Sequence, residues 1–213
     1  MAEKDVERLR KSNRLTAYLG LLIAVEFSIL WTAAVIVNGD WQLGRDTLSE
    51  LGGNVPSRWV FNIAVLIAGF AGIRFSFGLA KLLSGQRLGR TGSYVFAVAS
   101  LGLISVGVFP IDTGTPHTVA SIFFFTVAAI AAIILLYPLS KQFGVGSAPF
   151  ITTAAVVVVS FLALATTPVP FAEAVTVAGL LVWVAVLSLQ ILSDLRKANT
   201  GTAISERRGS EEN

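Results

Sequence analysis

The sequence contains no cysteine and only one histidine, and both shortages limit the chemistry that the chain can perform. Without cysteine there are no disulfides, no thiolate metal ligands and no thiol nucleophile. With His117 as the single imidazole, a zinc site built from several histidines is excluded. Any metal or catalytic site must therefore rely on carboxylates, hydroxyls and this one imidazole.

Charged residues are also scarce, at 14% of the 213 residues, whereas hydrophobic residues make up 54%. In a soluble domain, charged residues usually make up roughly a quarter of the sequence, so this composition indicates a protein that crosses the membrane several times. The sequence lacks a phosphate-binding glycine loop, a dinucleotide fingerprint and a basic-aromatic patch for nucleic acid. We therefore expect membrane lipids as partners, and no nucleic acid.

Six apolar stretches are long enough to cross a hydrocarbon core, which is about 30 Å thick. The seven prolines fall at or near the ends of these stretches, as expected for uninterrupted helices, because proline removes a backbone donor and clashes with the preceding turn. The predicted fold is all-α, a bundle of six transmembrane helices between polar tails, the second of which we expect to be disordered. The tails are residues 1–14 and 196–213, and the spans are about 15–37, 58–83, 92–109, 117–139, 149–167 and 171–195.

The distribution of lysine and arginine predicts the orientation, because the cytoplasmic loops of membrane proteins are enriched in positive charge. If both termini are cytoplasmic, that side of the membrane carries thirteen of the sixteen Lys and Arg residues. The opposite side carries Arg45 and Arg58, and Arg74 lies within the second span. We therefore predict a multi-pass protein of the cell (plasma) membrane with both termini cytoplasmic.

Two charged residues lie far from the ends of the predicted spans, Glu26 in the first and Arg74 in the second. Counted from the cytoplasmic ends of the spans, they lie roughly 16 Å and roughly 13 Å deep. An unpaired charge at the bilayer centre costs about 2.5–3.5 kcal/mol on insertion scales, so opposite charges at one depth are expected to pair. We predict an intramembrane ion pair between Glu26 and Arg74. The alternative is that Arg74 snorkels to the interface and Glu26 is neutral in an apolar setting.

Polar residues gather on the predicted outer face around residues 107–117, GVFPIDTGTPH, where an apolar helix reaches the water boundary. A histidine beside carboxylates at a helix N-terminus can act as a general base, a metal ligand or a pH sensor. The same face includes Glu173, at the start of the sixth span. The residues of this face that we predict to bind a ligand are Asp46, Ser49, Glu50, Asn54, Asp112 and His117.

Three chemical interpretations of this face stay open. His117 and Asp112, together with Glu50 or Asp46, could hold a divalent metal such as zinc or manganese. Ser49, His117 and Asp112 could form a serine hydrolase site, although no nucleophile elbow is present. The third interpretation is structural: these groups cap helices and satisfy loop backbones. We expect no cofactor, with a divalent metal as the alternative, and we favour a protein without enzymatic activity.

Short motifs also resemble a family of uncharacterised bacterial and archaeal membrane proteins, DUF 998. They are TLSELG at residues 47–52, the pair Phe61-Asn62, GVFP at residues 107–110, and His117 seven residues after Pro110. The resemblance covers residues 15–195 and implies six helices, with Ser49, Leu51 and Gly52 facing Gly107, Phe109, Pro110 and His117. It implies no established activity. The chain is also distantly similar to the Frag1 and DRAM group, whose members are linked to membrane lipid or stress processes.

These observations favour a membrane binding, sensing or accessory protein. At its outer face it would recognise a lipid head group, an ion, a membrane partner or a second copy of itself. One alternative is a membrane-embedded hydrolase acting on lipids, with His117 as base or metal ligand. The other is a small transporter or channel subunit, with Glu26 and Arg74 as its midplane groups.

Overall fold

The protein is described here by a computed structural model that covers the backbone of residues 3–211 and the side chains of residues 4–198 and 200. Within this part the chain forms six long helices and two short 3-10 helices, and no β-strand. All six long helices are apolar enough to cross a membrane, which confirms the predicted all-α fold. Their bounds are α1 Glu3–Asn38, η1 Leu48–Gly52, α2 Arg58–Leu82, α3 Arg87–Val108, η2 Ile111–Thr113, α4 Thr115–Phe143, α5 Ala148–Thr166 and α6 Val169–Glu211.

The first and last helices extend beyond the predicted spans. Helix α1 begins at Glu3, so the polar lead-in before the first span is helical. Helix α6 continues through Glu211, so residues 196–211, which we expected to be disordered, are helical as well. Nucleation is the costly step of helix formation. A membrane span supplies this nucleus, and the helix can then extend from it into the polar residues. Residues 1–2 and 212–213 of the predicted tails lie outside the described residues.

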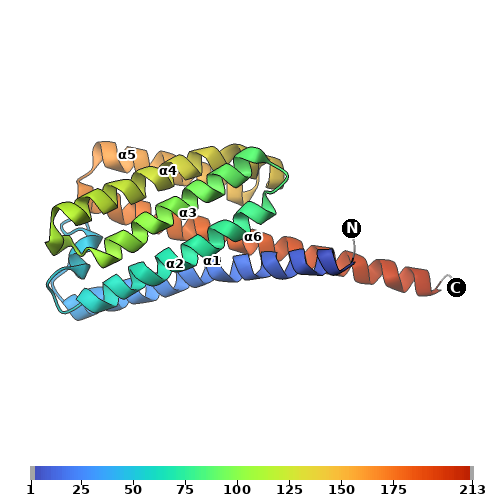
Figure 1. Cartoon of the computed structure of the whole chain (residues 1–213), viewed down its shortest axis with the longest axis horizontal. Coiled ribbons are helices and arrows are strands. Elements are labelled where there is room, and N and C mark those ends of the chain that lie inside the picture. Colours follow the sequence, from blue (N-terminus) through green and yellow to red (C-terminus); the bar gives the residue numbers. More distant parts are fainter. Residues whose placement is uncertain (1–2, 212–213) are drawn as a thin grey trace.

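The six long helices form a closed ring, because each packs against the next along the chain and α6 packs against α1. Consecutive helices run antiparallel, which places both termini at one end of the bundle (Figure 1). We call this the terminal end. The opposite end carries the connections at residues 39–57, 109–114 and 167–168, and we call it the lid end.

Three aromatic side chains meet across the interior of this helix ring: Phe75 of α2, Phe96 of α3 and Trp183 of α6. Their centroids lie 5.1, 6.3 and 6.4 Å apart in edge-to-face contacts. Trp183 Nε1 donates a hydrogen bond of 2.8 Å to Thr153 Oγ1 on α5, which satisfies the indole N–H away from water. This aromatic trio packs α2, α3 and α6 together in the interior of the bundle.

Candidate functional site

The helix η1, which we call the lid, closes the lid end of the ring. Its Leu48 and Leu51 are almost fully buried and belong to the hydrophobic core. The first residues of α2 and its N-cap hold the C-terminal part of the lid. Ser57 Oγ donates to Leu51 O at 2.8 Å, and Asn62 Nδ2 donates to Gly52 O at 2.8 Å. A Cβ atom at Gly52 would collide with the Asn62 side chain. Only glycine therefore allows this close approach.

Glu173, at the start of α6, holds the N-terminal part of the lid. Its two carboxyl oxygens accept hydrogen bonds from the Leu48 backbone N–H at 3.1 Å and from the Ser49 hydroxyl at 3.0 Å. Ser49 is buried, so this contact lies under the lid and away from water. The carboxyl group thereby connects the first loop of the chain to its last span.

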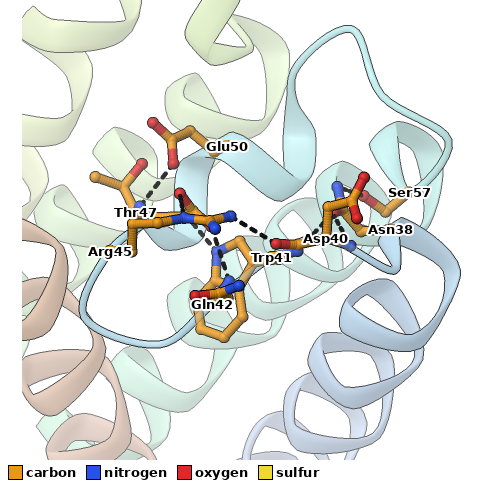
Figure 2. A network of polar contacts seen from close by, with 9 residues as sticks. Asn38, Asp40, Trp41, Gln42, Arg45, Thr47, Glu50 and Ser57 are labelled. Carbon is orange, nitrogen blue, oxygen red and sulfur yellow. Dashed lines mark hydrogen bonds and ion pairs between the residues drawn. The ribbon is translucent and has the colours of Figure 1, made fainter.

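The exposed acidic residues around the lid bind loop atoms and arginines. Asp46 lies 2.6 Å from Arg45 and also accepts from the Gln42 backbone N–H at 2.8 Å. Figure 2 shows Arg45 and Gln42 within the polar network of this loop. The hydrogen bond from Arg45, helped by the Gln42 N–H, lowers the pKa of the Asp46 carboxyl from its usual value. Glu50 Oε2 caps the lid by accepting from the Thr47 backbone N–H at 2.9 Å. This part of the predicted ligand site is thus engaged in holding the loop.

Asp112 and Asn54, the other predicted ligand residues on the surface, do not join the buried group. Asp112 pairs with Arg58 at 3.2 Å, and both side chains are partly exposed. Asn54 is exposed on the loop that follows the lid. Both outer arginines, Arg45 and Arg58, therefore face carboxylates and not an open anion site.

His117 is only 7% exposed and points into the bundle from the first turns of α4. Its Nδ1 lies 2.7 Å from Phe109 O, and its Nε2 lies 3.2 Å from Ser121 Oγ. A carbonyl oxygen can only accept, so Nδ1 carries the hydrogen, and in the neutral ring Nε2 accepts from the Ser121 hydroxyl. The predicted grouping of Ser49, His117 and Asp112 is not formed, because each of the three has a different partner.

Under the lid lies a small, partly open cavity of about 30 Å³, which we call the lid chamber. Its polar lining consists of Ser49 from the lid, Ser121 from α4 and Glu173 from α6, and the remaining walls are apolar. A cavity of this size holds a water molecule or an ion of similar size. Ser49, Ser121 and Glu173 therefore line one space, and His117 is linked to it through its contact with Ser121.

Sequence reasoning did not find Ser121. It lies one helical turn after His117, at the i+4 position that faces the same side of a helix, and this spacing was the available signal. The predicted metal ligands His117, Asp112 and Glu50 point to separate partners. Among the described residues no group of three or more His, Cys, Asp or Glu side chains could hold a metal ion.

The predicted ion pair between Glu26 and Arg74 is not formed. Gly78 of α2 packs against Thr16 of α1, and in this antiparallel register Ala68 lies opposite Glu26. Arg74 is six residues further along α2, about 9 Å towards the terminal end at 1.5 Å per residue. Arg74 is exposed on the outside of the helix ring, whereas both carboxyl oxygens of Glu26 are buried. Neither the depth nor the direction of the two side chains allows pairing.

A second hollow, an open groove of about 600 Å³, runs between α3 and α4 near the lid end. Its walls are mostly apolar and include Phe109, Val119 and Phe123. Successive residues of a helix are 100° apart, so these α4 residues face away from the side that carries His117 and Ser121. The groove and the lid chamber are therefore separate spaces.

The fold and this site define a multi-pass membrane protein in which a short 3-10 helix covers a small, mostly apolar chamber with three polar lining residues at one end of a ring of six helices. The chain belongs to the DUF998 family, described as a protein of unknown function, whose family model matches residues 20–190. This match confirms the resemblance drawn from the short motifs. No curated protein and no solved structure shows a significant similarity to the chain. The similarity to the Frag1 and DRAM group stays a prediction.

Proposed function

We propose that this protein binds a small monovalent cation in the lid chamber and has no enzymatic activity. The observation that carries the proposal is Glu173, which lines a water-sized space together with Ser49 and Ser121. An ionised carboxyl group offers about four lone-pair sites. The Leu48 N–H, the Ser49 hydroxyl and the Ser49 N–H approach this group, so at least one site remains for a bound cation.

The size and charge of the chamber favour a monovalent ion. Carboxylate and hydroxyl oxygens are the ligands that hard cations prefer, and a single negative charge balances a single positive one. A volume of about 30 Å³ admits a dehydrated alkali ion but excludes a lipid head group. A phosphate head group would also need free arginines, and Arg45 and Arg58 are paired with Asp46 and Asp112.

The proposed cation reaches the chamber from outside the cell. Thirteen of the sixteen Lys and Arg residues belong to segments at the terminal end. Cytoplasmic segments are enriched in positive charge, so the lid end faces outward. This distribution supports cytoplasmic termini in the plasma membrane. The lid then lies between the extracellular solution and the chamber.

Thermal unfolding of the purified protein tests the proposal. The melting temperature is measured in lithium, sodium, potassium and choline chloride at equal ionic strength. An ion that binds only the folded state stabilises it by about 2.7 kcal/mol at one hundred times its Kd. We expect one alkali cation to raise the melting temperature of the wild type and of Glu50→Gln, the matched control on the lid surface. Glu173→Gln should remove the difference between the salts.

Two results would contradict the proposal. One is the same melting temperature in all four salts for the wild type. The other is a cation effect that persists in Glu173→Gln, since the amide has a similar shape but no charge.

A second candidate function, a lipid hydrolase, is favoured by the contact between His117 Nε2 and Ser121 Oγ. A serine whose hydroxyl is bonded to an anchored imidazole is the core of a hydrolytic triad. Against it, Ser121 faces the lid chamber and not the open groove. A fluorophosphonate probe decides: labelling of Ser121 that disappears in His117→Ala supports the hydrolase, and an unlabelled wild type rejects it.

A further inference from the structure

Glu26 is a partly buried acid that does not line the lid chamber. Both of its carboxyl oxygens are buried and have no hydrogen-bond partner among the described residues. Helix α1 packs against α2, α6 and the lid. None of the charged side chains described on these elements forms an ion pair or hydrogen bond with Glu26; they are Glu50, Arg58, Arg74, Lys81, Glu173, Asp194, Arg196 and Lys197.

The position of Glu26 along α1 is defined by its neighbours on both sides. Phe27, the next residue, lines the lid chamber. Gly20, six residues before Glu26, packs against Phe75 of the aromatic trio. Glu26 therefore lies between the chamber at the lid end and the aromatic trio in the interior of the helix ring.

A buried carboxylate without a partner is costly in an apolar interior, and an acid inside a membrane span is by default a functional candidate. A proton compensates the charge and needs no space of its own. We propose that Glu26 is a proton-binding site, distinct from the cation site, which exchanges its proton with the extracellular side through the lid chamber. The step is a simple equilibrium in which the carboxylate and a proton from water form the neutral carboxylic acid.

The route follows from the packing around this site. Towards the terminal end, the contacts between Phe75, Phe96 and Trp183 close the interior of the ring. Towards the lid end, the chamber holds room for water. It is lined by Phe27 and not by Glu26, whose side chain lies about 100° around α1 from that of Phe27, so the proposed route passes around α1 to reach the chamber. On this route, exchange depends on how often the lid opens.

Infrared spectroscopy of the reconstituted protein tests the proton site. A protonated carboxyl group has a carbonyl band that a carboxylate lacks, and this band shifts when the proton is replaced by deuterium. We expect the wild type to show the band at neutral pH, Glu26→Gln to lose it, and Glu173→Gln to keep the Glu26 band. Glu26→Asp, which retains a carboxyl group, should restore a band at a shifted position. Absence of the band in the wild type, or no change in Glu26→Gln, would overturn the proposal.

The route is tested by the rate at which the band shifts in deuterated buffer. Glu173→Leu, which removes the acceptors that hold the lid, should speed the shift at least about 5-fold. Glu50→Gln should leave the rate unchanged. An equal rate in all three proteins would reject entry through the chamber. A Glu26 band without any effect of salts on the melting temperature would reject the cation site and leave the proton site standing.

Discussion

Replacing Glu173 by leucine should release the lid, and the structure gives the size of the effect. Leucine has a similar volume but cannot accept the hydrogen bonds from the Leu48 N–H and the Ser49 hydroxyl. The hydroxyl can turn to another acceptor, so we count only the backbone N–H. Leaving one buried donor unsatisfied costs about 1–3 kcal/mol. The equilibrium for opening the lid should rise about 5-fold to about 150-fold.

The absence of cysteine from the sequence provides a clean assay. A single Leu51→Cys places a thiol on the lid at a position that is 0% exposed, so a membrane-impermeant maleimide reacts only when the lid opens. The labelling rate is compared with and without Glu173→Leu. Glu173→Gln is the matched control, because its amide oxygen can accept from the Leu48 N–H while its NH₂ group donates to the Ser49 hydroxyl.

The expected order of labelling rates is Glu173→Leu well above Glu173→Gln, with the latter near the parent. An unchanged rate in Glu173→Leu would show that these hydrogen bonds do not hold the lid. A rate in Glu173→Gln as high as in Glu173→Leu would show that charge, and not hydrogen bonding, holds it.

Three further predictions concern other parts of the molecule. Trp183→Phe removes the hydrogen bond to Thr153 and should lower the unfolding free energy in detergent by about 1–2 kcal/mol. Arg74→Leu should leave that free energy unchanged or raise it, because the exposed Arg74 has no partner to lose. The lowered pKa of Asp46 means that its stabilising contact with Arg45 is complete above about pH 4 and is lost as the pH falls through the folded-state pKa; amide exchange in the loop should show this acid loss in the wild type and not in Asp46→Asn.

The six helices could be predicted from the sequence because length and apolar composition alone decide whether a segment can span a bilayer. Most prolines near the span ends marked the boundaries, as Pro149 does in the first turn of α5. Pro138 is the exception, because it lies inside α4, which continues to Phe143. The closure of the ring between α6 and α1 could not be predicted, since it depends on contacts between residues far apart in the sequence. The contact of Glu173 with the lid could not be predicted for the same reason, because it joins residues far apart in the sequence.

The pairing of Glu26 with Arg74 failed for a geometric reason. Depth in the membrane is one coordinate of a helical residue, and the rotation of the helix about its axis is another. The exposed residues Phe70, Arg74 and Phe77 share one face of α2, so Arg74 points out of the bundle. Similarly, His117 lay near the predicted acids in sequence, but its i+4 neighbour Ser121 on the same helix is its actual partner.

The last span, α6, completes both the ring of helices and the lid chamber. Helix α6 fills the gap between α5 and α1 and also carries Glu173. While the chain is being synthesised, α1 to α5 therefore form an open arc in the bilayer until α6 packs against both α5 and α1. A premature stop codon before residue 169 would leave a product that lacks Glu173 and exposes unsatisfied packing surfaces to membrane proteases, so such alleles should behave as complete losses and not as partial ones.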